Sequence, residues 1–270
     1  MIDIHSHIVW GLDDGASSIE ESLAMLSTAW QDGITDIVAT PHCNAQYQFH
    51  PDLLRQRTGE LGGRSEGRPI IHRGCEFHLN SDNIAPLLDN PLTYTINAGR
   101  YLLLEFPHVH IGRHTESILQ QLVEADIVPI VAHPERNPVL LQDLDRLESW
   151  IELGCLAQVT ARSITGGFGG RSRSAAFRLL DRGLVHVVAS DAHDPEYRTA
   201  TLSAAYLAVC VRFGEDLAEL LFTGNPGGII RGWPLPGGKL ILASPPKRRW
   251  WQFGLGSAVD RSKSYGELHL

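Results

Sequence analysis

The stretch MIDIHSH at residues 1–7 is a short apolar run that ends in two histidines. Four further short runs end in the same kinds of side chain. They are ATPH at 39–42, GCE at 74–76, HPER at 133–136 and SDAH at 190–193. Two single acids, Asp14 and Glu105, join these clusters. Since His, Asp and Glu bind Mn, Fe and Zn, five clusters at equivalent places predict one polynuclear metal site.

The apolar runs have strand character, and helical patterns lie between most of them. The expected strands cover residues 2–5, 34–39, 69–75, 101–105, 127–132, 155–160 and 185–190. The expected helices cover residues 17–30, 113–125, 140–153, 172–180, 197–212 and 215–222. This alternation predicts parallel βα units. Functional residues of a parallel α/β barrel lie at the C-terminal ends of its strands, so the clusters favour a barrel over an open doubly wound sheet.

The composition indicates one large globular domain, and the C-terminal residues differ from the rest of the chain in composition. The 270 residues are 43% hydrophobic and 20% charged, with a net charge of -8 from 23 basic and 31 acidic side chains. This balance argues against a nucleic-acid binder. We place the main folded domain at 1–232. Residues 233–270 contain PLPGG at 234–238 and PPKRRWWQF at 245–253, and are interpreted either as a flexible extension or as a basic-aromatic segment that docks on a membrane surface or membrane protein.

Cysteine usage and the N-terminus bear on the compartment. The four cysteines are far apart and have no C-x-x-C spacing, which indicates free thiols in a reducing environment. The chain begins directly with a strand-like run, without the pattern of a secretory signal. No stretch reaches the roughly 18 apolar residues of a spanning helix. We therefore expect a cytoplasmic protein.

The clusters supply a specific set of candidate metal ligands. His5 and His7 are two residues apart, a spacing that puts both side chains on one face of a strand, and Asp191 and His193 repeat it. Glu76 can bridge two cations through its two carboxylate oxygens. The full set is His5, His7, Asp14, His42, Glu76, Glu105, His133, Asp191 and His193. Nine ligands with one bridging carboxylate suit three metals better than one. The other histidines are interpreted as structural, with His108 and His110 near the mouth.

A clustered metal site makes bound water acidic, and the resulting hydroxide can attack a phosphorus atom. Arg136 and Arg198 follow two of the clusters, and their guanidinium groups match the geometry of a phosphate. Glu135 is interpreted as an ion-pair partner or a residue behind the ligands. A cysteine phosphatase is not supported, because no cysteine has an arginine six positions on. A serine nucleophile is not supported either, because the Gly-x-Ser-x-Gly string GRSEG at 63–67 does not follow a strand-like apolar run.

These motifs resemble those of the PHP (polymerase and histidinol phosphatase) superfamily. The matching strings are HSH at 5–7, ATPH at 39–42, HPER at 133–136 and SDAH at 190–193. Longer strings resemble the manganese-dependent PHP-type protein-tyrosine phosphatases found with bacterial capsule and exopolysaccharide genes. They are MIDIHSH at 1–7, GLDDG at 11–15, LEFP at 104–107, and QVTA at 158–161 with Ser163, Thr165 and Gly166. The resemblance covers residues 1–232.

The resemblance implies a distorted (β/α)7 TIM-like barrel with a three-metal centre. It implies three ligand groups: His5, His7, Glu76 and Asp191 for one metal, Glu76, Glu105 and His133 for a second, and Asp14, His42 and His193 for the third. It implies phosphate binding by Arg136 and Arg198. Mn2+ is the expected metal, although Fe and Zn share these ligands.

Three positions refine or depart from the resemblance. Glu105 stands where histidinol phosphatases more often have a histidine, which favours the tyrosine-phosphatase branch. Trp10 replaces an expected proline, which alters the rim of the site. Either Asp13 or Asp14 could be the ligand on the first loop, and we choose Asp14.

We therefore expect a phosphatase acting on phosphotyrosine of a bacterial membrane tyrosine autokinase. The alternatives are a small-molecule phosphoesterase of histidinol-phosphate type, and a weakly active metal-binding docking partner of a polysaccharide-export kinase. The basic-aromatic tail is the feature that favours the docking partner.

Overall fold

The computed structural model describes residues 1–80 and 82–241, so the basic-aromatic stretch of the tail lies outside the described residues. The strands are β1 (Ile2–Ser6), β2 (Asp36–Ala39), β3 (His42–Cys43), β4 (Ile70–Arg73), β5 (Glu76–His78), β6 (Tyr101–Glu105), β7 (Val128–Ala132), β8 (Leu156–Thr160) and β9 (Val187–Ala189). They form two parallel sheets, with the orders β1-β2-β4 and β3-β5-β6-β7-β8-β9. The α/β class with parallel strands is confirmed, and the closed seven-stranded barrel stays a prediction.

Two of the expected strands are interrupted. The run 34–39 continues past Thr40 and Pro41 into β3, and the run 69–75 continues into β5. Pro41 has no backbone N–H, so it cannot donate to the ladder, although its carbonyl still accepts from the Glu76 N–H at 3.1 Å. The expectation that Glu76 ends the third strand is therefore wrong, because Glu76 begins β5 and pairs with His42.

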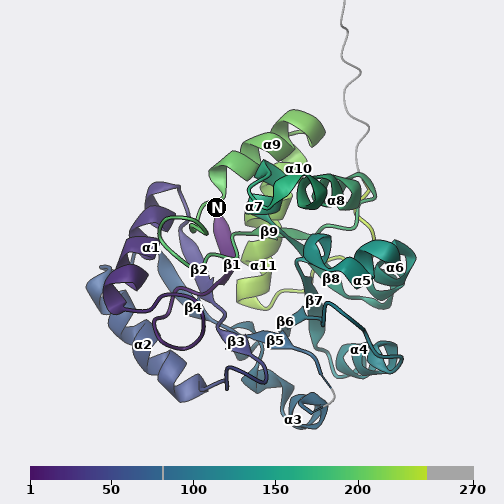
Figure 1. Ribbon diagram of the computed structural model, residues 1–270, viewed down its shortest axis with the longest axis horizontal. Coiled ribbons are helices and arrows are strands. Elements are labelled where there is room, and N and C mark those ends of the chain that lie inside the picture. Colours follow the sequence, from purple (N-terminus) through teal and green to yellow (C-terminus); the bar gives the residue numbers. More distant parts are fainter. Residues whose placement is uncertain (81, 242–270) are drawn as a thin grey trace, which may run out of the picture.

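Helices surround the strands on the outside of the molecule (Figure 1). They are α1 (Ile19–Gln31), α2 (Pro51–Arg64), α3 (Ile84–Asp89), α4 (Thr115–Glu124), α5 (Pro138–Gln142), α6 (Leu144–Leu153), α7 (Ala161–Thr165), α8 (Gly169–Asp181), α9 (Ser203–Phe213), α10 (Glu215–Glu219) and α11 (Asn225–Arg231). The start of α1 is confirmed, since the Ser18 hydroxyl accepts from the Glu21 N–H at 3.2 Å. None of the helices within the described residues is long and apolar enough to cross a membrane.

Two expected helices have different bounds. Residues 140–153 form α5 and α6 instead of one helix, because the Asp143 side chain accepts from the Arg146 N–H at 3.1 Å and caps a new helix. The helix expected from residue 197 begins only at Ser203. Asp32, at the end of α1, accepts from the Leu202 and Ser203 N–H groups at 2.6 and 2.9 Å and fixes that start.

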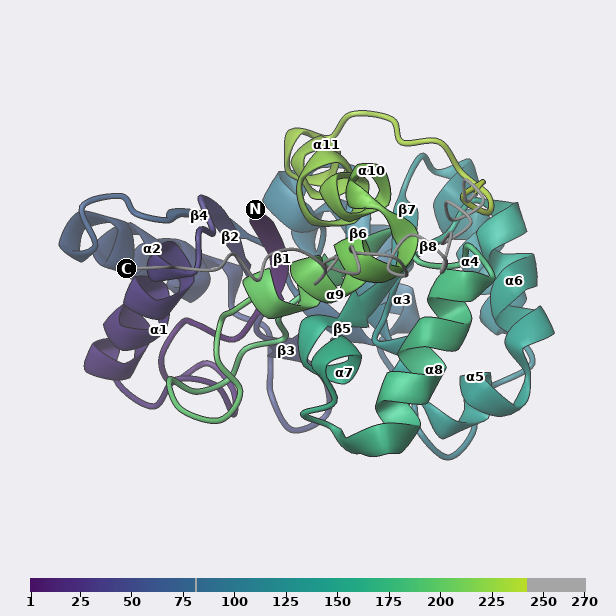
Figure 2. The ribbon, with the colours of Figure 1, turned by 90° about the horizontal axis from the view of Figure 1, so that it is seen from above.

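The interior has two apolar clusters separated by the strands. The larger one packs strand residues such as Leu104 and Val188 against the outer helices. The smaller one lies on the opposite face of the strands and includes Leu103, Val187 and Ile229 of α11. Figure 2 shows α11 on the side where the chain begins and α7 on the opposite side. Thus α11 covers the N-terminal ends of the strands with apolar side chains, and the other ends are left for polar residues.

The first and last strands are joined just beyond their ends. The Asp191 N–H donates to the His5 carbonyl at 2.9 Å, and the His7 N–H donates to the Ala192 carbonyl at 2.8 Å. The fully buried Asp3 carboxylate accepts from the N–H of Ser190 at 3.0 Å and from its hydroxyl at 2.5 Å. Burial raises the pKa of Asp3 to about 6, although these hydrogen bonds lower it.

We expect Asp3→Ala to lower the free energy of unfolding by about 2–4 kcal/mol, because the buried donors of Ser190 lose their acceptor. Urea unfolding followed by circular dichroism measures this. Asp52→Ala is the matched control, since Asp52 is 87% exposed and pairs with Arg55 at the surface. The control should change the free energy by less than about 0.5 kcal/mol. Equal stability of the two variants would contradict the role given to Asp3.

Candidate metal centre

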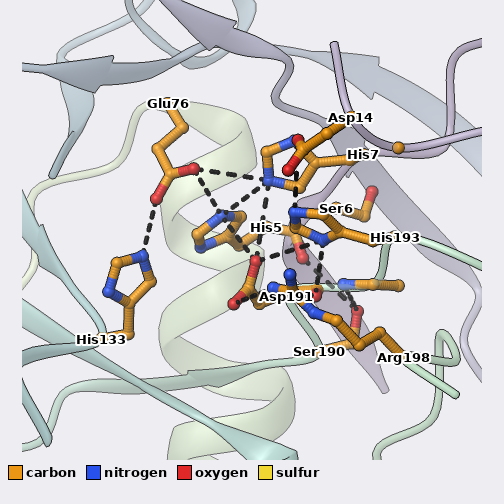
Figure 3. A network of polar contacts seen from close by, with 12 residues as sticks. His5, Ser6, His7, Asp14, Glu76, His133, Ser190, Asp191, His193 and Arg198 are labelled. Atoms are coloured by element: carbon orange, nitrogen blue, oxygen red, sulfur yellow. Dashed lines mark hydrogen bonds and ion pairs between the residues drawn. The ribbon is translucent and has the colours of Figure 1, made fainter. Parts of the chain in front are cut away.

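All nine predicted ligands gather at the C-terminal side of the strands. His5 lies on β1, Glu105 ends β6, and His133 directly follows β7. Three groups of ligand atoms lie within 4.8 Å of one another: His7, Asp14, His42 and His193, then His5, His7 and Glu76, then His42, Glu76 and Glu105. Figure 3 shows most of these side chains pointing toward one another. The structure therefore brings the predicted set together, while the assignment of each residue to a metal stays a prediction.

The buried side of the centre contains His5, His7, Glu76 and Asp191. The Nε2 atom of His5 lies 3.3 Å from Glu76 Oε2, 3.4 Å from Asp191 Oδ1 and 3.3 Å from His7 Nε2. Ligand atoms that share one ion at about 2.1 Å lie about 3.0–3.5 Å from each other. These side chains are almost fully buried. The spacing of their polar atoms therefore fits a shared cation.

Glu76 has the position of a bridging carboxylate. Its Oε1 lies 2.8 Å from His133 Nε2, while its Oε2 lies 3.0 Å from His42 Nδ1. Both His42 Nδ1 and Glu76 Oε2 are buried and make no hydrogen bond among the described residues. Apart from their 3.0 Å approach to each other, these buried polar atoms are not satisfied by hydrogen bonds, which is costly, so the pair fits a site that a cation completes.

The outer side of the centre contains Asp14, His42 and His193. Asp14 Oδ1 lies 3.3 Å from His42 Nε2 and 3.6 Å from His193 Nε2, and the Asp14 side chain is 50% exposed. The ligand groups differ in part from those that the resemblance implies. His7 also lies with this outer group, and His42 also lies with Glu76 and Glu105.

Three histidines are held by a partner behind the ring. The Nδ1 atom of His5 lies 2.9 Å from Gln158 Oε1, that of His7 lies 2.6 Å from Asp13 Oδ2, and that of His193 lies 3.1 Å from the Asp191 carbonyl. Each partner accepts a hydrogen bond from Nδ1–H, so in the neutral histidine the Nε2 lone pair faces the centre.

Asp13 and Asp14 therefore have different surroundings. Asp13 Oδ2 contacts His7 and also accepts from the His42 N–H at 2.9 Å, whereas Asp14 faces His42 and His193 directly. Asp13 orients two candidate ligands, which supports the choice of Asp14 as the ligand itself.

Sequence reasoning missed the roles of Gln158 and His78. His78 was interpreted as structural, but its Nδ1 lies 2.8 Å from Glu105 Oε2. Gln158 is a fully buried amide within an otherwise apolar strand, and a buried polar side chain requires a partner. A glutamine inside the expected strand 155–160 was the signal that the sequence offered. For His78, the contact with Glu105 depends on the pairing of β5 with β6, which no local pattern reveals.

Of the two histidines expected at the mouth, only His108 lies near the centre. Burial lowers the pKa of His108. The Glu105 carboxylate opposes this shift, and the positive charges of His133 and Arg136 lower the pKa further. His110 instead lines a separate cavity of about 340 Å³.

Two ligand candidates have strained backbones. His133 has φ 32° and Asp191 has φ 54°, both in the left-handed region that non-glycine residues rarely adopt. The strain is held by local hydrogen bonds, among them Arg136 N–H to the His133 carbonyl at 2.9 Å. Such strain concentrates at functional sites because the surroundings must aim a side chain that an ordinary strand would not.

Both candidate phosphate-binding arginines contact the carboxylate of Asp191. Arg198 Nη2 donates to Asp191 Oδ2 at 2.8 Å, and Arg136 donates to the same oxygen. The Nε atoms of both arginines are buried and have no hydrogen-bond partner in the described part of the chain. Glu135 is not their ion-pair partner, since it accepts from the Thr160 N–H at 3.0 Å and the Ser163 hydroxyl at 2.7 Å.

The pKa values of the candidate ligands depend strongly on burial and on the charged groups next to them. Burial opposes the charged form of His7, but the Asp13 carboxylate outweighs it and raises the pKa of His7 to about 9. Burial likewise opposes the charged form of His42, but Asp14 and Glu76 raise its pKa to about 11. Burial favours a protonated Asp191, yet His5 and the nearby arginines hold the pKa of this carboxyl well below its usual range. Without metals, protons therefore occupy His7 and His42 near neutral pH, whereas burial lowers the pKa of His193 to about 3.

We expect Mn2+ binding to the EDTA-treated protein to release protons near neutral pH, and the affinity for Mn2+ to fall as the pH is lowered. A metal needs the neutral imidazole, so protons held by His7 and His42 must leave when it binds. Calorimetric titration in two buffers of different ionisation enthalpy measures the number released. His42→Ala should release fewer protons, and the control His72→Ala should release as many as the unmodified chain. Binding without proton release would show that these histidines are already neutral in the metal-free protein.

Comparison with known proteins agrees with this geometry. A family model described as "Capsular polysaccharide synthesis, CpsB/CapC" matches residues 1–231. Tyrosine-protein phosphatase YwqE of Bacillus subtilis (strain 168) is 33% identical over 251 residues, which are 92% of this chain and 96% of that protein. Tyrosine-protein phosphatase CpsB of Streptococcus pneumoniae is 32% identical over 241 residues, 85% of this chain and 98% of that protein.

A solved structure also matches closely. It comes from work on YwqE from Bacillus subtilis and CpsB from Streptococcus pneumoniae, described as unique metal-dependent tyrosine phosphatases. The match has a TM-score of 0.83 at 31% identity and covers 91% of this chain and 100% of that chain. The family resemblance inferred from the motifs is confirmed, and the chain belongs to the CpsB/CapC family of capsular polysaccharide synthesis.

Proposed function

We propose that this protein is a metal-dependent protein-tyrosine phosphatase with a three-metal centre, loaded with Mn2+. The observation that carries the proposal is the convergence of nine ligand side chains around the bridging position of Glu76. The relatives YwqE and CpsB are named tyrosine-protein phosphatases, which supports phosphotyrosine as the substrate. When bound, such metals lower the pKa of water and polarise a phosphoryl oxygen.

The arginines of the site bind and orient the phosphate. The unpartnered Nε–H groups of Arg136 and Arg198 are buried donors that a phosphate oxygen can satisfy. Asp191 fixes both guanidinium groups through one oxygen while its other oxygen faces His5. This arrangement keeps the two donors in place before substrate arrives, so little ordering is required on binding.

The leaving group favours a phenol over an alcohol. Tyrosine has a pKa of about 10, so phenolate leaves without a strong acid to protonate it. An alkyl phosphate such as histidinol phosphate demands more from a general acid. His108 lies near the centre and burial lowers its pKa, which makes it a weak base and keeps it neutral near pH 7.

We further infer that the strands form a distorted (β/α)7 barrel. The hydrogen bonds that join the ends of β1 and β9 support this closure. The substrate is a phosphotyrosine protein, which we propose to be a membrane tyrosine autokinase of capsule synthesis, in keeping with the family description. The cytoplasmic location and the membrane contact of the tail stay predictions.

We expect His42→Ala and Asp191→Ala to reduce hydrolysis of p-nitrophenyl phosphate by at least about 100-fold, because each removes a ligand side chain. The measurement uses Mn2+-loaded protein and includes metal content. His72→Ala is the matched control, since His72 pairs with Asp36 away from the centre, at 3.0 Å. Near-normal turnover by either ligand variant would refute the site assignment.

The substrate class is tested with phosphotyrosine peptide and histidinol phosphate, each supplied to the Mn2+-loaded protein and after chelation. The proposal requires peptide hydrolysis that depends on metal and exceeds histidinol phosphate hydrolysis. The reverse preference would favour the small-molecule phosphoesterase. Metal binding without hydrolysis of either compound would favour the docking partner.

We expect Arg198→Lys to lower kcat/KM for the phosphotyrosine peptide by about 100-fold, because a lysine cannot replace the fork of donors that a guanidinium offers. Metal content should stay the same, since Arg198 is not a ligand candidate. Steady-state kinetics with parallel metal measurement checks this. A change confined to metal content would assign Arg198 a structural role through Asp191.

A further inference from the structure

Three arginines surround one aromatic ring beside the centre. The guanidinium carbons of Arg136, Arg162 and Arg198 lie 4.8, 5.6 and 5.7 Å from the centroid of Phe168. Arg136 and Arg198 also contact Asp191. Within the described residues the Arg162 side chain makes no hydrogen bond or ion pair, and its guanidinium lies against the Phe168 ring. In this part of the chain Arg162 is therefore a free cation next to the phosphate-binding pair.

The backbone around Phe168 is built to hold Arg162 in this position. Arg162 lies on α7, and a glycine-rich turn leads from α7 to Phe168. Gly166 has φ +91°, a conformation that side chains rarely allow. A Cβ on Gly167 would lie 2.5 Å from the Cγ atom of Arg162 and 3.0 Å from its Cζ atom. Glycine at 167 thus leaves the space that Arg162 occupies across the turn.

The charge balance around the ring indicates an anion from outside the chain. Asp191 neutralises part of the charge of Arg136 and Arg198, and the phosphate takes up the remainder. The chain has 31 acidic side chains against 23 basic ones, yet none of the described acids pairs with Arg162. Stacking on an aromatic ring stabilises an exposed cation only by about 0.5–1 kcal/mol. The charge and the N–H donors of the Arg162 guanidinium therefore stay available to a second anion.

Arg162 contacts the same Phe168 ring as Arg136 and Arg198 but, unlike them, makes no contact with Asp191 within the described residues. A single phosphate held by Arg136 and Arg198 leaves Arg162 for a different group of the same substrate. In a phosphotyrosine protein, the group that fits is the carboxylate of a residue next to the phosphotyrosine in sequence. Phe168 is half-buried and offers apolar surface to the stem of such a residue.

We propose that Arg162 and Phe168 form a specificity subsite that binds the carboxylate of an acidic residue adjacent to the phosphotyrosine. This inference rests on the proposed phosphatase function. It concerns only which peptides are preferred, because Arg162 does not contact the ligand residues of the metal centre. Arg162 is therefore a specificity-determining residue and Gly167 a positioning residue.

The test compares two phosphotyrosine peptides that differ only in Glu or Gln beside the phosphotyrosine. The measured quantity is the ratio of kcat/KM for the Glu peptide to that for the Gln peptide, with Mn2+-loaded protein. We expect the unmodified chain to prefer the Glu peptide, and Arg162→Gln to lower the ratio about tenfold. Gly167→Ala should lower the same ratio, because the new methyl group displaces the Arg162 side chain. Added salt should also reduce the preference.

Arg55→Gln is the matched control, since it removes the same charge from the exposed surface of α2. Its ratio should equal that of the unmodified chain. A protein that cleaves both peptides equally, or an Arg162→Gln variant with an unchanged ratio, would overturn the subsite and leave the phosphatase proposal standing. Failure to cleave either peptide would overturn both proposals. Equal thermal stability and metal content of the variants separate loss of specificity from misfolding.

Discussion

The close pairing of the first strand with the segment after the last strand is the constraint on which the metal centre depends. Two backbone hydrogen bonds link His5 and His7 to Asp191 and Ala192, and the buried Asp3 carboxylate secures Ser190 beside them. Because His5 and His7 belong to one segment and Asp191 to the other, their ligand atoms come within 3.6 Å without further adjustment. Backbone hydrogen bonds thereby fix the relative positions of residues that lie nearly two hundred positions apart in the sequence.

On one face of the strands, an apolar layer is followed by a polar layer toward the C-terminal ends. Leu103 belongs to the inner apolar cluster, and Glu105 follows two residues later on the same face of β6. In β9, Val187 and Ala189 are followed in the same way by Asp191. The apolar layer and α11 supply the stability, which permits the adjoining layer to hold buried charges that a small core could not tolerate.

Much of this arrangement was predictable from the sequence, because it depends on local pattern. Each expected strand overlaps an observed one, and each cluster of candidate ligands lies at the end of an apolar run that can be identified without a structure. What could not be predicted depends on contacts between distant segments. The start of α9 is set by Asp32 at the end of α1, and the division of β2 from β3 depends on the lost donor of Pro41.

The candidate site shows the same division at the level of single side chains. The candidate ligands could be named from the sequence because few roles suit histidines and acids at strand ends, and their role as ligands stays a prediction. The residues behind them were not, since Asp13 and His78 have their partners only after β1, β3, β5 and β6 come together. Asp13 serves two candidate ligands at once, the ring of His7 and the backbone of His42. A site of this kind therefore depends on two sets of residues. The candidate ligands can be predicted from the local sequence, and the supporting contacts form only in the assembled fold.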